Sequence, residues 1–228
     1  MLTHGQHHML NFLRTLSGLA LSLLGSGAVM GIEIPPYKVL SLEAAFEIRQ
    51  YEPVLIAETV VEGDMSTASN SGFRLLADFI FGNNLVPGTD QAGKIAMTAP
   101  VTLEPQSAKI AMTAPVTLEP LSGETNMQTA TQWRVDFVMP RQYTLENIPK
   151  PKNSAVKLRQ VPGKVLLVHK FSGLGSLSTV QQKTDEMLAW AARKGYKTIG
   201  SVQLARYDPP WTLPMFRRNE IMIEIAKP

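Results

Sequence analysis

The sequence predicts an α+β fold in which a pseudo-twofold repeat forms a curved antiparallel sheet or barrel flanked by two α-helices. Segments with alternating apolar and polar residues, typical of half-buried strands, surround two segments whose apolar residues recur at helical spacing. The order strand, strand, helix, strand, strand occurs twice along the chain. Each half should therefore contribute one helix and several strands to a common core.

In the first half, we expect strands over 46–51 and 54–62, where apolar and polar residues alternate. The residues expected on the buried face of the first strand are Phe46, Ile48 and Gln50. A helix is expected over 66–81, because its apolar residues recur every three or four positions, and Gly82 should end it. The residues expected on its buried face are Phe73, Leu76, Ala77 and Ile80.

An internal repeat follows this helix. Residues 94–105 and 109–120 both have the sequence KIAMTAPVTLEP, and each copy alternates as a strand does. One interpretation is an antiparallel hairpin of the two copies, which pairs Leu103 with Ile110, Val101 with Met112 and Met97 with Val116. The other interpretation is a tandem duplication in which one copy is extruded as a loop.

The second half repeats the order of elements after a strand over 133–139 and a proline-rich connector at 149–151. Strands are expected over 156–161, 165–171, 202–207 and 221–225, with a helix over 178–194 between the second and the third. Ser178 and Gln181 resemble a capping box, and Gly195 should close the helix. The residues expected on its inner face are Val180, Thr184, Met187, Leu188 and Ala191.

The composition fits one globular core. A chain of 228 residues with 44% hydrophobic and 18% charged residues suits a single domain plus an apolar segment. The formal net charge of +3 comes without the Lys and Arg clusters of a surface that follows phosphates, so nucleic acid is not expected as a partner. The absence of cysteine excludes disulfides, cysteine nucleophiles and thiolate-ligated metals.

Residues 1–30 are predicted to be a signal peptide or an N-terminal anchor, and residues 31–228 to be the functional domain. An almost uncharged apolar run from Leu16 to Met30 follows Arg14, and it is shorter than the roughly 20 residues of a membrane span. We therefore expect an exported protein, either periplasmic or membrane-associated. Cleavage of the leader and its retention as a membrane anchor are both open.

Five motifs occur in a fixed order along the chain. They are KIAMTAPV, present twice, FVMPRQYTLENIP at 137–149, FSG at 171–173, ARYDPPW at 205–211 and RRNEI at 217–221. Together they cover roughly residues 37–225 and resemble the SOUL heme-binding protein family, and through it the GyrI-like effector-binding fold. The resemblance implies a pseudo-twofold barrel with two long helices. It also implies binding of heme or other porphyrins in a shallow apolar site, without known catalysis.

The resemblance places a porphyrin against the first helix and the loop before the last strand. The matching residues that could contact the ring are Phe73, Ala77, Trp211 and Met215. Arg217 and Arg218 are the candidate cations for the heme propionates. The alternative for these arginines is an ion pair with Glu220 or another nearby carboxylate that fixes the loop.

The axial ligand of a bound heme is left open by the sequence. Some members of the family have a histidine in the first strand that has been proposed as the ligand, and the matching residue here is Gln50, a poor ligand for iron. His169 is the one histidine of the expected domain, within an alternating strand. It could be a ligand or a structural core residue.

No motif indicates a known class of catalyst. A Gly-rich phosphate loop, a nucleophile elbow and a His-rich metal set are all missing from the sequence, and its carboxylates are scattered. The sequence therefore predicts non-enzymatic binding of heme or a related tetrapyrrole in a hydrophobic cleft. The alternative is a GyrI-like binder of another small hydrophobic ligand, or a weak hydrolase on the same fold.

Overall fold

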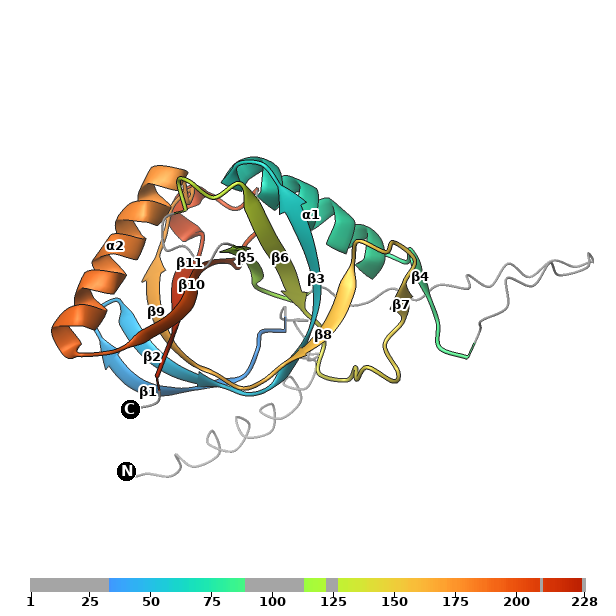
Figure 1. The fold of residues 1–228 in the computed structure, drawn as a ribbon, viewed down its shortest axis with the longest axis horizontal. Coiled ribbons are helices and arrows are strands. Elements are labelled where there is room, and N and C mark those ends of the chain that lie inside the picture. Colours follow the sequence, from blue (N-terminus) through green and yellow to red (C-terminus); the bar gives the residue numbers. More distant parts are fainter. Residues whose placement is uncertain (1–32, 89–112, 122–126, 210, 227–228) are drawn as a thin grey trace, which may run out of the picture. The chain divides into compact units, whose positions relative to one another are not determined.

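The computed structural model describes residues 33–88, 113–121, 127–209 and 211–226. Its elements in chain order are β1 (Tyr37–Glu43), β2 (Phe46–Tyr51), β3 (Val54–Glu62), α1 (Met65–Ile80), β4 (Asn84–Leu85), β5 (Val116–Pro120), β6 (Gln132–Val138), β7 (Lys150–Pro151), β8 (Lys157–Val161), β9 (Val165–Phe171), α2 (Leu177–Lys194), β10 (Thr198–Arg206), the 3₁₀ helix η1 (Pro214–Phe216) and β11 (Asn219–Ile225). Both long helices lie on the outer side of a curved sheet (Figure 1).

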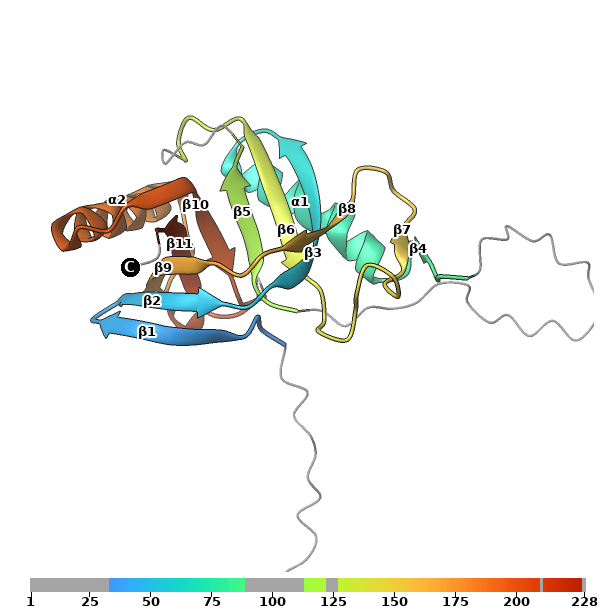
Figure 2. The ribbon, with the colours of Figure 1, turned by 60° about the horizontal axis from the view of Figure 1, so that its bottom comes forward.

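Among the described residues, nine strands form one antiparallel sheet in the order β1-β2-β9-β11-β10-β5-β6-β3-β8. The strands β5, β6 and β3 lie on one side of the β5–β10 contact, and β10, β11 and β9 lie on the other in the same arrangement. Each half is completed by a strand from the other half, since β8 pairs with β3 and β2 pairs with β9. The predicted α+β class and pseudo-twofold repeat are confirmed (Figure 2).

The helices cover one face of the sheet and bury the main hydrophobic core there. β6 contributes Trp133, Val135 and Phe137 to this core, and none of the three is more than 1% exposed. The alternate residues of β6, including Arg134 and Asp136, point to the opposite face, because successive strand residues alternate in direction. This helix-free face lies inside the curve of the sheet (Figure 1).

Local sequence signals set the ends of the helices. The side chain of Asp64 caps α1 by accepting hydrogen bonds from two backbone N–H groups, and Gly82, with φ of 123°, follows its end. Ser176 caps α2, so the capping box expected at Ser178 is wrong, because the helix begins before that residue. Gly195 ends α2 in the left-handed conformation, as predicted.

The first hairpin differs from the prediction in two respects. β1 is not predicted from the sequence, because its residues after Tyr37 are all exposed and carry no alternating pattern. Gln50 is exposed, so its predicted burial is wrong, whereas Glu47 and Arg49 on the other side of β2 are buried. Both faces of β2 are covered, and alternation alone therefore cannot identify its buried side.

The second copy of the repeated segment provides β5. Both edges of β5 are occupied, since Val116 lies opposite Phe137 of β6 and opposite Arg206 of β10. The hairpin register that pairs Met97 with Val116 is therefore wrong. The first copy, together with Ile110 and Met112, lies outside the described residues. The proline-rich connector at 149–151 contributes β7, which pairs with β4.

The leader expected at residues 1–30 lies outside the described residues. Within the described ranges, neither α1 nor α2 combines the length and the hydropathy that a membrane-spanning helix needs.

Gly72 allows α1 to approach β6 closely. A Cβ atom at this position would lie 2.5 Å from Val135 Cγ2, which is far inside a normal contact. We expect Gly72→Ala to lower the free energy of unfolding by about 1–3 kcal/mol, because the helix must move away from the sheet. Urea denaturation measures this loss. Equal stability of Gly72→Ala and the wild type would contradict the close packing.

Candidate functional site

Arg206, at the end of β10, connects the sheet to α1 and to the loop before α2. Its Nη1 donates to Ser69 Oγ of α1 at 3.1 Å, and its Nη2 donates to the Gly175 carbonyl at 3.2 Å. Its Nε is buried without a hydrogen-bond partner among the described residues. Burial and the nearby charge of Arg217 both lower the pKa of Arg206. No described carboxylate forms an ion pair with this guanidinium, so its positive charge can attract an anionic group.

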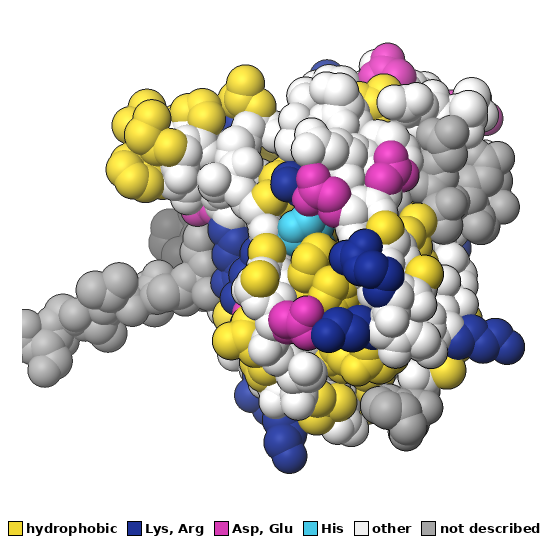
Figure 3. All heavy atoms as spheres, turned by 90° about the vertical axis from the view of Figure 1, so that its left-hand side faces the viewer, with side chains coloured by type: hydrophobic (Ala, Val, Ile, Leu, Met, Phe, Trp, Pro, Cys, Tyr) yellow, Lys and Arg dark blue, Asp and Glu magenta, His cyan; other side chains and the backbone are white. Residues whose placement is uncertain are grey.

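Two loops beside Arg206 expose a group of large apolar side chains. The backbone N–H of Gly173 donates to the Pro214 carbonyl at 2.9 Å, which joins the loop before α2 to the loop before β11. The exposed apolar residues of the two loops are Leu174, Trp211, Leu213, Met215 and Phe216, each between 58% and 82% exposed. We call these five residues the apolar loop surface. Figure 3 shows a group of hydrophobic side chains projecting from the upper edge of the molecule. Such patches on soluble proteins mark binding surfaces.

The α1 residues named from the sequence have different environments. Phe73 is 39% exposed and contacts the Phe137 ring edge-on, with centroids 5.6 Å apart. It follows Ser69 by one helical turn, so it shares the helix face that meets Arg206. Ala77 is buried at 9% exposure and offers little surface to a ligand. α1 thus brings Phe73, but not Ala77, to the neighbourhood of Arg206.

The two sequence-named arginines differ in their partners. Arg218 donates to Glu220 Oε1 from Nε at 2.9 Å and from Nη2 at 2.7 Å, and its guanidinium lies 4.0 Å from the centre of the Tyr207 ring. The geometry therefore supports the carboxylate-pairing interpretation for Arg218. Arg217 Nε donates to the Thr212 carbonyl at 2.7 Å, which holds the loop in shape. Arg206 was not identified from the sequence, although it lies within the ARYDPPW motif.

His169 lies beneath α2. Its Nδ1 is 3.1 Å from the Lys183 carbonyl, its ring packs on Phe46 at 4.4 Å, and it is 4% exposed. Burial lowers its pKa, which favours the neutral imidazole at pH 7. These contacts are those of a structural core histidine, and they do not bring His169 to the apolar loop surface.

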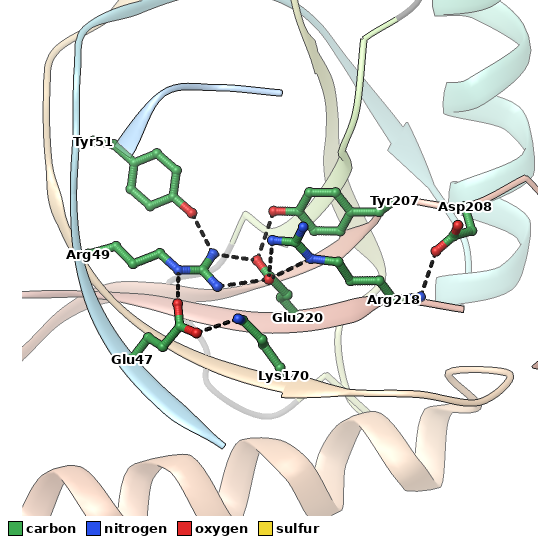
Figure 4. Close-up of polar contacts among 8 residues, drawn as sticks. All are labelled: Glu47, Arg49, Tyr51, Lys170, Tyr207, Asp208, Arg218 and Glu220. Atoms are coloured by element: carbon green, nitrogen blue, oxygen red, sulfur yellow. Dashed lines mark hydrogen bonds and ion pairs between the residues drawn. The ribbon is translucent and has the colours of Figure 1, made fainter. Parts of the chain in front are cut away.

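A buried charge network occupies one half of the helix-free face (Figure 4). Arg49 of β2 donates to both Glu220 oxygens of β11, at 2.8 and 2.9 Å, and neither side chain is exposed. Arg49 also donates to Glu47 Oε2 at 2.6 Å, and Tyr207 donates to Glu220 Oε2 at 2.8 Å. Burial alone would raise the pKa of Glu220, but the hydrogen bonds from Arg49 and Tyr207 hold it below its ordinary value.

The helix-free face also contains a cavity of about 200 Å³, which residues of both halves line and which has Asp136 in its lining. Arg134 lies 3.3 Å from Glu58 and 3.2 Å from Glu119, and Arg159 lies 2.7 Å from Glu58. Asp136 is only 8% exposed and forms no ion pair with a described residue. The sequence does not predict that Asp136 is buried, because it occupies a polar position of an alternating strand.

The pKa of Asp136 is raised to about 7. Burial is the largest cause, and the negative charges of Glu119 and Glu58 add to it, while the neighbouring Thr117 hydroxyl opposes the rise in part. Asp136 thus exchanges its proton near neutral pH, inside a cavity.

The fold is that of a pseudo-twofold α+β protein with two helices on one face of a curved antiparallel sheet. The family model of the SOUL heme-binding protein matches residues 32–108 and 103–224, so the chain belongs to this family. The two matched stretches overlap at residues 103–108, which include the end of the first copy of the repeat and the residues between the two copies. No curated protein matches the chain by sequence.

Solved structures share the fold at low identity. The EcmrR C-terminal domain is 11% identical, with 84% of this chain and 99% of that chain covered and a TM-score of 0.57. An uncharacterized conserved protein from Listeria innocua is 13% identical, with 82% and 94% covered and a TM-score of 0.51. A hydrolase from Listeria innocua is 12% identical, with the same coverage and a TM-score of 0.50. The predicted GyrI-like fold is confirmed at the level of architecture.

Asp136 should make the stability of the folded protein depend on pH. Its pKa of about 7 in the folded state exceeds the ordinary 3.8, so the folded state retains a proton that the unfolded chain has lost between these values. The stabilisation from this proton is lost as the pH rises through 7. Relative to Asp136→Asn, the wild type should lose about 2–3 kcal/mol of unfolding free energy between pH 5 and pH 8.

Urea denaturation of both proteins at several pH values measures this difference. Asp185→Asn, on the outer side of α2, is the matched control and should follow the wild type. A difference between Asp136→Asn and the wild type that does not change with pH would contradict the raised pKa.

Proposed function

We propose that this protein binds heme or a related tetrapyrrole, without acting on it as an enzyme, at the surface formed by α1, Arg206 and the apolar loop surface. The observation that carries the proposal is the combination of exposed apolar side chains with the Arg206 guanidinium, which has no carboxylate partner among the described residues. Membership of the SOUL heme-binding protein family supports it. We also propose, from the apolar leader, that the protein is exported to the periplasm or to a membrane-associated position.

The apolar loop surface suits one face of a flat macrocycle. Trp211 is 82% exposed and Met215 is 67% exposed, so both can be covered by a ligand without unfolding the core. Phe73 adds an aromatic edge from α1. Burial of exposed apolar area against a porphyrin is favourable by about 25 cal/mol per Å² of area removed from water.

The propionates of the tetrapyrrole need cations, and Arg206 fits this role better than Arg218. Arg218 is committed to Glu220, whereas Arg206 has only a hydroxyl and a carbonyl as described hydrogen-bond partners. Arg217 supplies a second positive charge nearby. A guanidinium without a carboxylate partner among the described residues, as in Arg206, favours an anionic group such as a propionate.

The two residues considered from the sequence as axial ligands of a bound heme lie away from this surface. Gln50 is on β2 and His169 faces α2, so neither residue is part of the proposed site. Binding should then rest on the apolar and arginine contacts, and an iron-free porphyrin should bind nearly as well as hemin. A porphyrin site of this kind is suited to carriage or buffering of the ligand.

Hemin titration of the full chain, followed by absorbance, tests the proposal. We expect saturable binding that weakens about tenfold or more in Arg206→Met, because charge-assisted hydrogen bonds are lost. Trp211→Ala, which removes an exposed side chain, should also weaken binding. Arg141→Met, at an exposed ion pair with Glu52, is the matched control and should bind as the wild type does.

His169→Ala should retain hemin binding, and protoporphyrin without iron should bind with an affinity within a few-fold of that of hemin. Unchanged affinity in folded Arg206→Met and Trp211→Ala, or loss of binding in His169→Ala, would contradict the proposed site. Circular dichroism of each variant establishes that it is folded.

A further inference from the structure

The place of β5 in the sheet joins the two halves of the protein, and the chain contains two copies of the sequence that fills it. β5 lies between β6 and β10 (Figure 2), where Leu118 faces Val135 of β6 and is completely buried. Residues 94–105 repeat residues 109–120 without a single difference, so Leu103 is the counterpart of Leu118. Two identical segments of the chain thus match one place in the sheet.

The polar side-chain contacts that hold β5 in place come from residues inside the repeat. At one end of the strand, the Thr113 hydroxyl donates to the last carbonyl of β6. At the other end, Glu119 Oε2 accepts a hydrogen bond from Arg134 Nη1 at 3.2 Å. The first copy has the same two residues, as Thr98 and Glu104. An exchange of the copies therefore keeps these contacts.

The connections on either side of β5 can accommodate such an exchange. With the first copy in place, the connection before the strand shortens from residues 89–112 to residues 89–97, which still reach up to about 33 Å. The connection after the strand lengthens from residues 121–126 to residues 106–126. Because the cost of closing a loop grows only with the logarithm of its length, these opposite changes alter the ratio of the two arrangements only about twofold.

We propose that the two copies exchange in the β5 position, so that the protein populates two arrangements of the sheet whose registers differ by fifteen residues of chain. In one arrangement the second copy forms β5, and in the other the first copy does. The exchange moves fifteen residues from the connection before β5 to the connection after it. The latter connection leads to α2, because the Met127 N–H donates to Gln181 Oε1 of that helix at 3.2 Å. The exchange thereby sets how much chain lies between β5 and this contact, and it does not depend on the porphyrin surface.

A charge placed in one copy tests the exchange in the full chain. If β5 has one fixed sequence, Leu118→Asp buries an unpaired carboxylate in the core and unfolds the protein. If the copies exchange, the first copy takes the β5 position, and the equilibrium constant of folding falls only about two- to tenfold. Leu103→Asp should likewise lower it by less than about tenfold, because the second copy remains intact. Urea denaturation measures both changes.

The double variant Leu103→Asp/Leu118→Asp should be unfolded, because neither copy can then fill the position without burying a charge. Val135→Asp is the matched control on β6, opposite Leu118, and should unfold the protein by itself because residue 135 has no second copy. Unfolding of Leu118→Asp to the same extent as Val135→Asp would overturn the proposal. A folded double variant would overturn it too, since the position would then tolerate a charge.

A disulfide identifies the copy that occupies the position in a chain with an unaltered core, because the sequence has no cysteine of its own. Glu119 lies opposite Arg134, and Glu104 takes its place in the other arrangement. In Glu104→Cys/Glu119→Cys/Arg134→Cys, mild oxidation should link residue 134 to residue 119 in some molecules and to residue 104 in others, in a ratio between about 1:10 and 10:1. Mass spectrometry after trypsin distinguishes the links, because Lys109 separates the copies. A link to residue 119 alone would contradict the exchange.

Discussion

The buried ion pair between Arg49 and Glu220 joins β2, an early strand of the sheet, to β11, its last strand in the chain. The residues are 171 positions apart, neither side chain is exposed, and two parallel hydrogen bonds join them. Burial of two charges costs several kcal/mol for each ion, and this cost is offset only where the remaining hydrogen-bonding groups are satisfied. Here Glu47 and Tyr207 complete the network, with Lys170 pairing with Glu47 at its edge (Figure 4).

This network also positions the porphyrin surface. Arg218 binds Glu220 through its side chain and donates its backbone N–H to Asp208 Oδ2 at 2.6 Å. The loop that carries Trp211 and Met215 begins and ends at these two residues. The exposed apolar loop is thus anchored to the most deeply buried charges in the sheet. The two ends of the loop to which a ligand would bind are therefore held in place.

Much of the fold could be predicted because apolar residues recur every three or four positions in a helix and every second position in a half-buried strand. The two long helices and the strands with one buried face follow from spacing alone, and the repeated order of elements gives the pseudo-twofold architecture. β1 could not be predicted, because its exposed residues carry no alternation. The predicted burial of Gln50 is wrong because β2 is covered on both faces. The charged residues on its other face, such as Arg49, are buried because they form ion pairs.

The site was less predictable, because it depends on which arginine meets which carboxylate. Arg218 and Arg206 lie in motifs of similar appearance, and only the register of β10 and β11 assigns Glu220 to Arg218 and leaves Arg206 facing Ser69. Likewise Asp136 looks like an ordinary outward residue of an alternating strand. Asp136 lacks both guanidiniums that bind Glu220. Val161 stands where the equivalent of Arg49 would be, and Arg134, the counterpart of Arg218, pairs with Glu58 and Glu119.

Nuclear magnetic resonance of the ¹⁵N-labelled protein with zinc protoporphyrin tests most directly whether the porphyrin binds on the side of the helices. We expect the largest shifts in the amide signals of Ser69, Gly175 and Trp211, with little change at Thr117 and Gln203 of the helix-free cavity. Large shifts at Thr117 and Gln203 with none at Ser69 and Trp211 would place the porphyrin on the helix-free face of the sheet. That result would contradict binding on the side of the helices.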